Sequence, residues 1–165
     1  MGLNRLLGLG LVLAALGGAS QTVPDPDSKE SQAPPPPPFD VRQLIPIEMP
    51  KYVAMRFGVD PKTLSISPDG IVRYVVVVTS PAGLTNAMYE GIRCSKGEVM
   101  TLARYSSNGN WAVNADPQWQ SLTDNLPSKH ALALARQGLC EGRSVAARSV
   151  PDMVKALTTA HQNLF

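Results

Sequence analysis

The chain has 165 residues, a formal net charge of +2 and two cysteines. This length allows one ordinary domain with accessory segments, and so small a net charge argues against nucleic acid or an anionic membrane surface as a partner. The basic residues are also scattered, without the aromatic and basic stripe that grips single-stranded nucleic acid.

Residues 1–19 have the features of an export signal. Arg5 precedes an apolar run at residues 6–16, and Gly17 and Ala19 occupy the −3 and −1 positions of a small-x-small cleavage site. We expect cleavage after Ala19; an uncleaved membrane anchor is the alternative. The apolar run is shorter than the ~20 residues that span a bilayer, so we expect no stable membrane span after cleavage. No cysteine follows the small residues, which argues against a lipid anchor.

Residues 20–40 have the composition of a disordered linker. Four charged residues precede the run APPPPP at 33–38. Such a stretch cannot bury a core, and consecutive prolines favour an extended polyproline II rod. We expect a spacer here, with a ligand for a proline-recognition domain as the alternative, and a single domain over residues 41–165.

The first part of the domain predicts short strands. Two prolines in residues 41–50 predict an edge or a lead-in. Residues 51–58 are β-branched and aromatic enough for a strand, and residues 63–67 alternate as a short strand does. The Pro-Asp-Gly at residues 68–70 predicts a tight turn.

Residues 69–94 predict a β-hairpin at the centre of the sheet. Four consecutive valines in the strand at residues 71–79 indicate that both of its faces are covered. A loop at residues 80–83 leads to a second strand at residues 86–94.

A four-residue loop sets the register of this hairpin. It places Arg73 opposite Glu90, Tyr74 opposite Tyr89 and Val75 opposite Met88. An ion pair on one face and an aromatic pair on the other each contribute about 0.2–1 kcal/mol.

The remaining sequence changes from strands to helices. Strands are predicted at residues 98–105, 111–113 and 117–122. An Ala- and Leu-rich helix follows at residues 128–137, ended by Gly138, and a C-terminal helix at residues 150–163. This order predicts an α+β fold: a single antiparallel β-sheet of about five to six strands with the C-terminal helices packed on it.

Cys94 and Cys140 are the only cysteines. In an exported chain two cysteines normally pair, so we expect one disulfide bond between them. They do not form a CxxC motif, which disfavours a thiol oxidoreductase. Two free thiols, or a pair of metal ligands, is the alternative.

A resemblance to a known family rests on two short runs: DGIVRY at residues 69–74 and YEGIRC at residues 89–94. Two tryptophans and a helix ending at Cys140 follow them. Over about residues 46–140 the chain resembles the cryptic-neisserial-protein-like family of uncharacterised periplasmic or lipoprotein-like proteins of Gram-negative bacteria. The resemblance implies a periplasmic location and no activity. The segment after Cys140 lies outside it.

Catalytic and metal-binding patterns are not evident. His130 and His161 lie on separate predicted helices, far apart in sequence, and no nucleophile, zinc-protease, P-loop or dinucleotide motif occurs. We therefore predict no catalytic residue, no metal site and no cofactor.

Six residues are candidates for a binding surface on the sheet: Arg73, Tyr89, Glu90, Arg93, Trp111 and Trp119. With the register above, Arg73 and Glu90 share one face, and Tyr89 and Arg93 the other. An arginine could hold a small anion or a peptide carboxylate, and the tryptophans could line a ligand groove. The structural alternative is a sheet ion pair, core aromatics, and tryptophans that fill the space between sheet and helix.

These observations predict a non-enzymatic periplasmic module that binds through its sheet. Its partner would be an envelope protein, a cell-wall component or a small ligand. An envelope hydrolase using Glu90 with His130 or His161 is the alternative, and it requires one histidine to reach a carboxylate in a cleft. A haem- or metal-binding protein is the third hypothesis.

Overall fold

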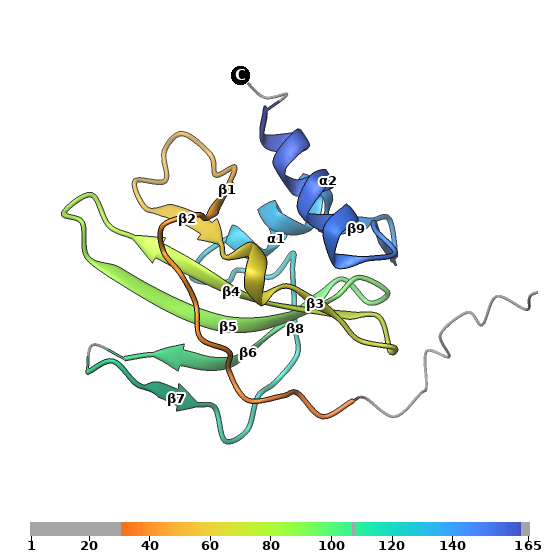
Figure 1. Cartoon of the computed structure of the whole chain (residues 1–165), viewed down its shortest axis with the longest axis horizontal. Helices are drawn as coiled ribbons and strands as arrows, with labels where there is room; N and C mark the ends of the chain where they lie inside the picture. The colour runs from red at the N-terminus through yellow and green to blue at the C-terminus, as the bar shows by residue number, and fades with distance from the viewer. Residues whose placement is uncertain (1–30, 107, 163–165) are drawn as a thin grey trace, which may run out of the picture.

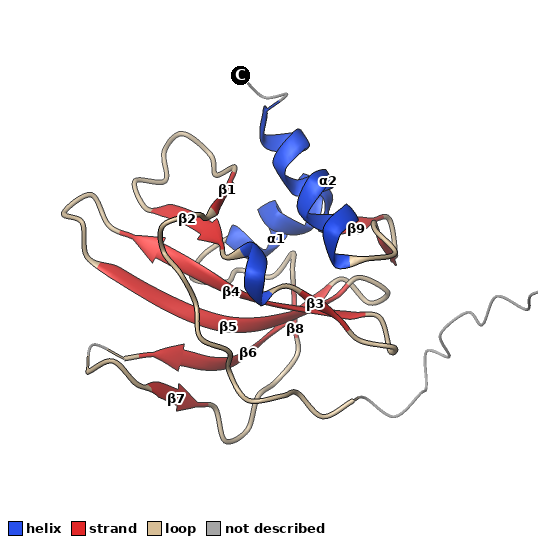
Figure 2. Cartoon of the chain, viewed as in Figure 1, coloured by secondary structure: helices blue, strands red, loops and turns tan. Residues whose placement is uncertain are grey.

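The computed structural model describes residues 31–106 and 108–162, with side chains described up to residue 160. The expected signal at residues 1–19, residues 20–30 of the expected linker and the side chain of His161 lie outside the described part. Within that part, antiparallel strands form one large sheet, and two helices lie on one side of it (Figures 1 and 2). The predicted α+β class is therefore confirmed.

Eight of the described strands make up the sheet, more than predicted. The main path runs β1 (Ile45–Ile47), β2 (Arg56–Val59), β4 (Ile71–Thr79), β5 (Thr85–Arg93), β6 (Glu98–Tyr105) and β7 (Trp111–Val113). Off this path, β3 (Ser65–Ile66) pairs with β4 and β8 (Gln120–Ser121) pairs with β6. A separate two-stranded sheet joins β9 (Cys140–Glu141) to β10 (Ser144–Val145).

The helical layer follows the strands. Helix α1 (His130–Leu134) continues into the π-helical η2 (Ala135–Leu139), and α2 (Val150–Gln162) packs against η2. Gly138 adopts a φ of 134°, which only glycine tolerates well. The helix therefore breaks at Gly138, as predicted, although the segment runs one residue further.

Three predicted strands are longer than the observed ones, and the strand predicted at residues 117–122 is reduced to the two residues of β8. Residues 51–55 form turns rather than the start of a strand, so β2 begins only at Arg56. Pro61–Thr63 form a 3-10 turn, η1, capped by the Asp60 side chain, which shortens the following strand β3 to two residues. Proline near the first position of a helical turn and an aspartate cap together favour that turn over a strand.

The central strands are covered on both sides, as the valine run predicts. One core fills the space between the sheet and the helices and includes Val72, Tyr74 and Val76. The second core lies on the other face of the sheet and includes Val75 and Val77. All five side chains are buried.

The segment at residues 31–40, which composition assigns to a free linker, lies against this second face. The orange chain crosses the sheet in Figure 1 before it reaches β1. Ala33 and Phe39 pack on the second core, and the backbone N–H of Asp40 donates to Asp60 Oδ2 at 2.7 Å. We call residues 31–40 the strap, because both of its ends are attached to the domain.

Candidate functional site

The hairpin register differs from the predicted one by a single residue. Ser80 N–H donates to the Leu84 carbonyl, which leaves a three-residue loop closed by Gly83 at a φ of 83°. Arg73 therefore lies opposite Gly91, and Glu90 lies opposite Tyr74. A shift of one residue reverses the face of every side chain on one strand, so the predicted Arg73–Glu90 and Tyr74–Tyr89 pairs are wrong.

Glu90 faces the helices and lies in the core between the sheet and the helices. Its Oε2 accepts hydrogen bonds from the Tyr74 hydroxyl at 3.0 Å and from His130 Nε2 at 2.8 Å. Its Oε1 accepts one from the Thr101 hydroxyl at 3.3 Å. Glu90 is 2% exposed and His130 6%, so these donors replace water around a buried carboxylate.

The His130 ring is held on both sides. Its Nδ1 lies 3.0 Å from the Ser128 hydroxyl, and its plane stacks on Phe57 with 5.1 Å between ring centroids. Because an ionised carboxylate can only accept, His130 Nε2–H donates to Glu90, while Nδ1 shares a hydrogen bond with the Ser128 hydroxyl. The result is a continuous chain of hydrogen bonds from Ser128 through His130 to Glu90.

Electrostatics favour an ionised Glu90. Burial alone would raise its pKa, but the charge of His130 and the hydrogen bonds from His130, Tyr74 and Thr101 outweigh burial and hold the pKa below the ordinary 4.5. Burial and the neighbouring carboxylate raise the pKa of Tyr74, which therefore remains a donor.

Arg73 lies on the opposite face and anchors the strap. Its guanidinium donates to the Ser67 hydroxyl at 2.8 Å and to the Ser31 carbonyl at 2.9 Å. Asp69 accepts from both the backbone N–H and the hydroxyl of Ser31, each at 2.7 Å. Although burial opposes it, hydrogen bonds from Ser67, Ser31 and Ile71 lower the pKa of Asp69 to about 2.

An apolar pocket of about 660 Å³ lies between the strap and the sheet, and we call it the strap pocket. Its lining from the strap is residues 31–36, and its lining from the domain is Tyr89, Met100, Leu102, Val113, Asn114, Pro117 and Trp119. Two of the six predicted binding residues, Tyr89 and Trp119, thus meet at one cavity. Arg93 stands over the Trp119 ring at 4.3 Å and pairs with Glu98 at 2.5 Å.

Trp111 is placed differently. It joins an aromatic cluster with Phe39 of the strap and Tyr105, at centroid distances of 5.7 and 5.2 Å. Both tryptophans lie on the strap side of the sheet. The alternative in which they fill the space between sheet and helix is therefore wrong.

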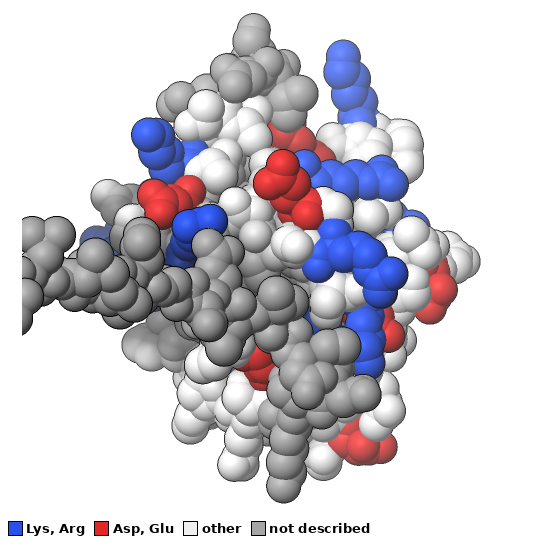
Figure 3. Space-filling view, turned by 90° about the vertical axis from the view of Figure 1, so that its right-hand side faces the viewer, with Lys and Arg blue, Asp and Glu red and all other residues white. Residues whose placement is uncertain are grey.

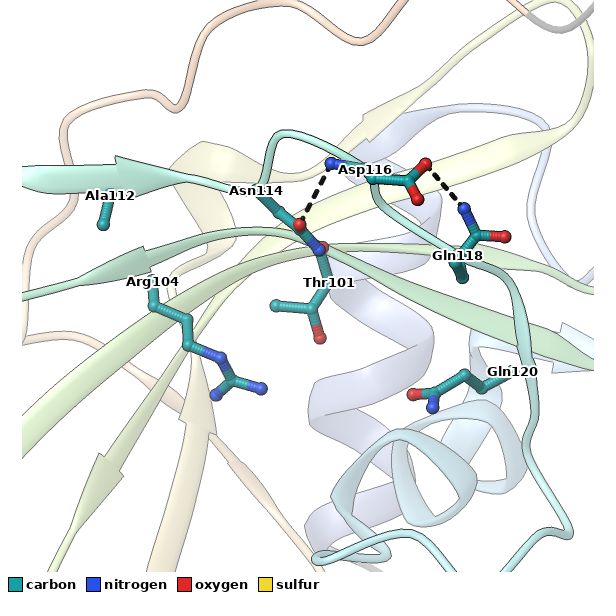
Figure 4. Close-up of a pocket in the computed structure, with 7 residues that line it drawn as sticks. All are labelled: Thr101, Arg104, Ala112, Asn114, Asp116, Gln118 and Gln120. Carbon is teal, nitrogen blue, oxygen red and sulfur yellow. Dashed lines mark hydrogen bonds between the residues drawn. The ribbon is translucent and has the colours of Figure 1, made fainter.

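A second pocket, of about 460 Å³, opens where β6, β7 and the segment before β8 meet, and we call it the polar pocket. It is lined by Thr101, Arg104, Ala112, Asn114, Asp116, Gln118 and Gln120 (Figure 4). Thr101 and Arg104 project to the same side of β6 in this view. Glu90 and Met88, which pair with these two residues on β5, lie on the helix side of the sheet.

The expected disulfide bond is present. Cys94 at the end of β5 is bonded to Cys140 at the start of β9, with 5.6 Å between their Cα atoms. It joins the sheet to the segment that follows η2, so the helical layer is covalently attached to the hairpin.

Comparison with known proteins identifies the family of the chain. A model of the CNP1-like family matches residues 23–158. The chain belongs to this family. It is also 29% identical over 109 residues to Cryptic neisserial protein 1 of Neisseria gonorrhoeae, a match that covers 55% of this chain and 54% of that relative. The chain thus spans about half the length of the curated relative it matches. No solved structure matches the chain.

The family match confirms the resemblance carried by residues 69–74 and 89–94, but its extent is larger than predicted. The matched residues 23–158 include the strap and most of α2, whereas the sequence indicated only residues 46–140. Outside residues 46–140, the strap packs on the second core, and α2 contributes Met153 and Leu157 to the core beneath the helices.

Sequence reasoning missed several partners of the candidate residues. Ser128, Thr101 and Phe57 surround the Glu90–His130 pair, and Ser31 and Asp69 surround Arg73. One signal was available: a glutamate inside a strand of apolar neighbours needs buried donors. Nothing local in the sequence says that a histidine 40 residues away supplies one.

Among the described residues, no group of three or more His, Cys, Asp or Glu side chains is arranged to hold a metal ion. In the same part of the chain, no helix is long and apolar enough to cross a bilayer.

Proposed function

We propose that the protein is a non-enzymatic periplasmic binding module whose ligand site is the strap pocket. The observation that carries the proposal is the pocket itself: a cavity of about 660 Å³ with walls from two separate parts of the chain. Sites for small molecules have volumes of about 300–1,000 Å³ and mostly apolar linings. The periplasmic location rests on the export signal expected at residues 1–19.

The lining favours a small ligand with an apolar or aromatic body. Tyr89 and Trp119 contribute aromatic side chains to the lining, and Met100 contributes a flexible thioether that adapts to an irregular shape. Prolines 34–36 close the other side with few polar groups, because proline has no backbone N–H. A charged ligand would lose its hydration here without gaining a partner for its charge.

The surface charge visible on one face argues against a polyanionic partner. On the face shown in Figure 3, acidic side chains lie among the basic ones instead of leaving a continuous basic band. Such a mixed surface gives little long-range attraction for a polyanion.

The hydrolase alternative has one observation in its favour, the 2.8 Å hydrogen bond between Glu90 and His130. General acid–base catalysis also needs a substrate within hydrogen-bond reach of the pair. Both side chains are buried, and neither lines the strap pocket or the polar pocket. The pair therefore fits a role in core stability better than one in catalysis.

Adjacent residues of β7 provide a matched test. Val113 lines the strap pocket and Ala112 lines the polar pocket, so their side chains lie on opposite faces of the sheet. We expect the neutral apolar dye N-phenyl-1-naphthylamine to bind the wild-type protein saturably, measured by its fluorescence. Val113→Asp should weaken binding at least tenfold, whereas Ala112→Asp should leave it unchanged. The proposal fails if the wild type shows no saturable binding, or if both variants bind as the wild type does.

A further inference from the structure

The polar pocket has a lining quite unlike that of the strap pocket. Three primary amides, one carboxylate, one guanidinium and one hydroxyl face it, together with the methyl group of Ala112. An amide both donates and accepts hydrogen bonds, as does a sugar hydroxyl. Asp116 and Arg104 balance each other in formal charge, which disfavours phosphate or a polycarboxylate.

We propose that the polar pocket is a second ligand site, for a neutral, hydroxyl-rich ligand of the saccharide class. The proposal does not rest on the strap pocket: the two pockets share Asn114, but their lining from β6 and β7 lies on opposite faces. Its ligand also differs in chemistry from the apolar ligand proposed for the strap pocket.

One wall of the polar pocket is organised before any ligand arrives. Asn114 Nδ2 donates to the Thr101 carbonyl at 3.2 Å, and the Asp116 backbone N–H donates to Asn114 Oδ1, also at 3.2 Å. Gln118 Nε2 donates to Asp116 Oδ1 at 2.7 Å. Two of these bonds are drawn in Figure 4. Groups held in this way lose little side-chain freedom when a ligand binds.

Hydrogen-bonding capacity remains for a ligand. Asn114 and Gln118 each keep an N–H beyond the one already used, and Asp116 keeps its second carboxylate oxygen. The side-chain amide of Gln120 also lines the pocket, and in Figure 4 it points toward the space below Thr101. These groups offer both donors and acceptors around one cavity.

Thr101 connects the polar pocket to the buried cluster. Its hydroxyl proton is directed to Glu90 Oε1, because an ionised carboxylate can only accept. The Thr101 oxygen is therefore left to accept from a ligand hydroxyl. A bound ligand would extend the hydrogen-bond chain through Thr101 to Glu90, and His130 donates to the other oxygen of the same carboxylate.

Nuclear magnetic resonance titration of ¹⁵N-labelled protein tests the proposal. The probes are glucose, N-acetylglucosamine and maltose, with inorganic phosphate as the anionic comparison. We expect at least one saccharide to give saturable shifts in the backbone amides of residues 101–104, 112–116 and 118–120, with a Kd in the millimolar range. The His130 ring resonances should shift in the same titration, which contact at the pocket surface alone would not cause.

Two glutamine variants provide the control. Gln120→Leu should weaken saccharide binding at least fivefold, whereas Gln32→Leu makes the same change at the strap pocket and should have no effect. Both glutamines are exposed, so both variants should fold. The proposal is overturned if no saccharide gives saturable shifts, if phosphate alone does, or if the two variants behave alike.

Discussion

Replacing Glu90 tests whether the buried cluster stabilises the domain through its hydrogen bonds or through its charge. In Glu90→Gln, the amide oxygen can take the place of Oε2 and accept from Tyr74 and His130, while the amide nitrogen donates to the Thr101 hydroxyl. All three contacts can remain hydrogen bonds, the one to Thr101 with its direction reversed, and the charge is lost. Hydrogen bonds to charged groups contribute about 1 kcal/mol more than neutral ones, so the free energy of unfolding should fall by about 1–3 kcal/mol.

Glu90→Leu has a different outcome. It leaves the Tyr74 hydroxyl and His130 Nε2 without their acceptor inside the core. Each orphaned buried group costs about 1–3 kcal/mol, so the free energy of unfolding should fall by about 2–6 kcal/mol. Urea unfolding followed by circular dichroism measures all three proteins, with the denaturant slope as a check that the unfolded states are comparable. If Glu90→Leu is no less stable than Glu90→Gln, the assigned hydrogen bonds do not stabilise the fold.

Wild type and Glu90→Gln should differ in how the free energy of unfolding depends on pH. Because the pKa of Glu90 in the folded protein lies below its ordinary 4.5, the unfolded chain binds the proton first as the pH falls. The stability contributed by this charge is complete above about pH 4.5 and is lost as the pH falls toward the pKa of the folded state. The difference between wild type and Glu90→Gln should therefore shrink between pH 6 and pH 3. A difference that grows over this range would contradict an ionised Glu90.

Three further predictions concern stability, each measured by urea unfolding. Replacing both Cys94 and Cys140 by serine should lower the free energy of unfolding by about 4 kcal/mol, since the bond closes a loop with a sequence separation of 46; an unchanged midpoint would contradict this. Gly138→Ala should cost about 1–3 kcal/mol, because φ is 134° there, a conformation that strains a residue with a Cβ. Leu157→Ala, at a fully buried site on α2, should cost about 2–5 kcal/mol; a smaller loss would show that α2 packs loosely.

The fold class was predictable because its signals are local. The valine run of β4, the Asp-Gly and Pro-Ala-Gly turns and the Ala- and Leu-rich helix each specify their own element. The register of the hairpin was not predictable in this way. Residues 80–84 accommodate a three- or four-residue loop, and the choice depends on which face of β5 the helices cover. His130, from outside the hairpin, offers Glu90 a better partner than Arg73 would.

The strap shows a second limit of sequence reasoning. A composition rich in proline predicts that a segment has no core of its own, and this holds for residues 31–40. Composition does not show whether the segment packs on another core. The decisive residues are few: Ser31 bonds to Arg73 and Asp69, and Phe39 packs edge-on against Tyr105 at 4.9 Å. Because these contacts depend on only a few residues, the average amino-acid composition of a twenty-residue segment does not reveal them.

A β-bulge in β6 explains how one strand serves two chemically different pockets. Tyr89 pairs with Ala103 but the next residue of β5, Glu90, pairs with Thr101, so Leu102 is the extra residue. In a regular ladder, alternation beyond Thr101 would place Arg104 on the strap side and Ala103 on the helix side. The bulge exchanges them: Ala103 joins the second core and Arg104 reaches the polar pocket. Bulges that re-aim side chains occur often beside binding sites. The separation of an apolar and a polar pocket across β6 therefore depends on a single inserted residue.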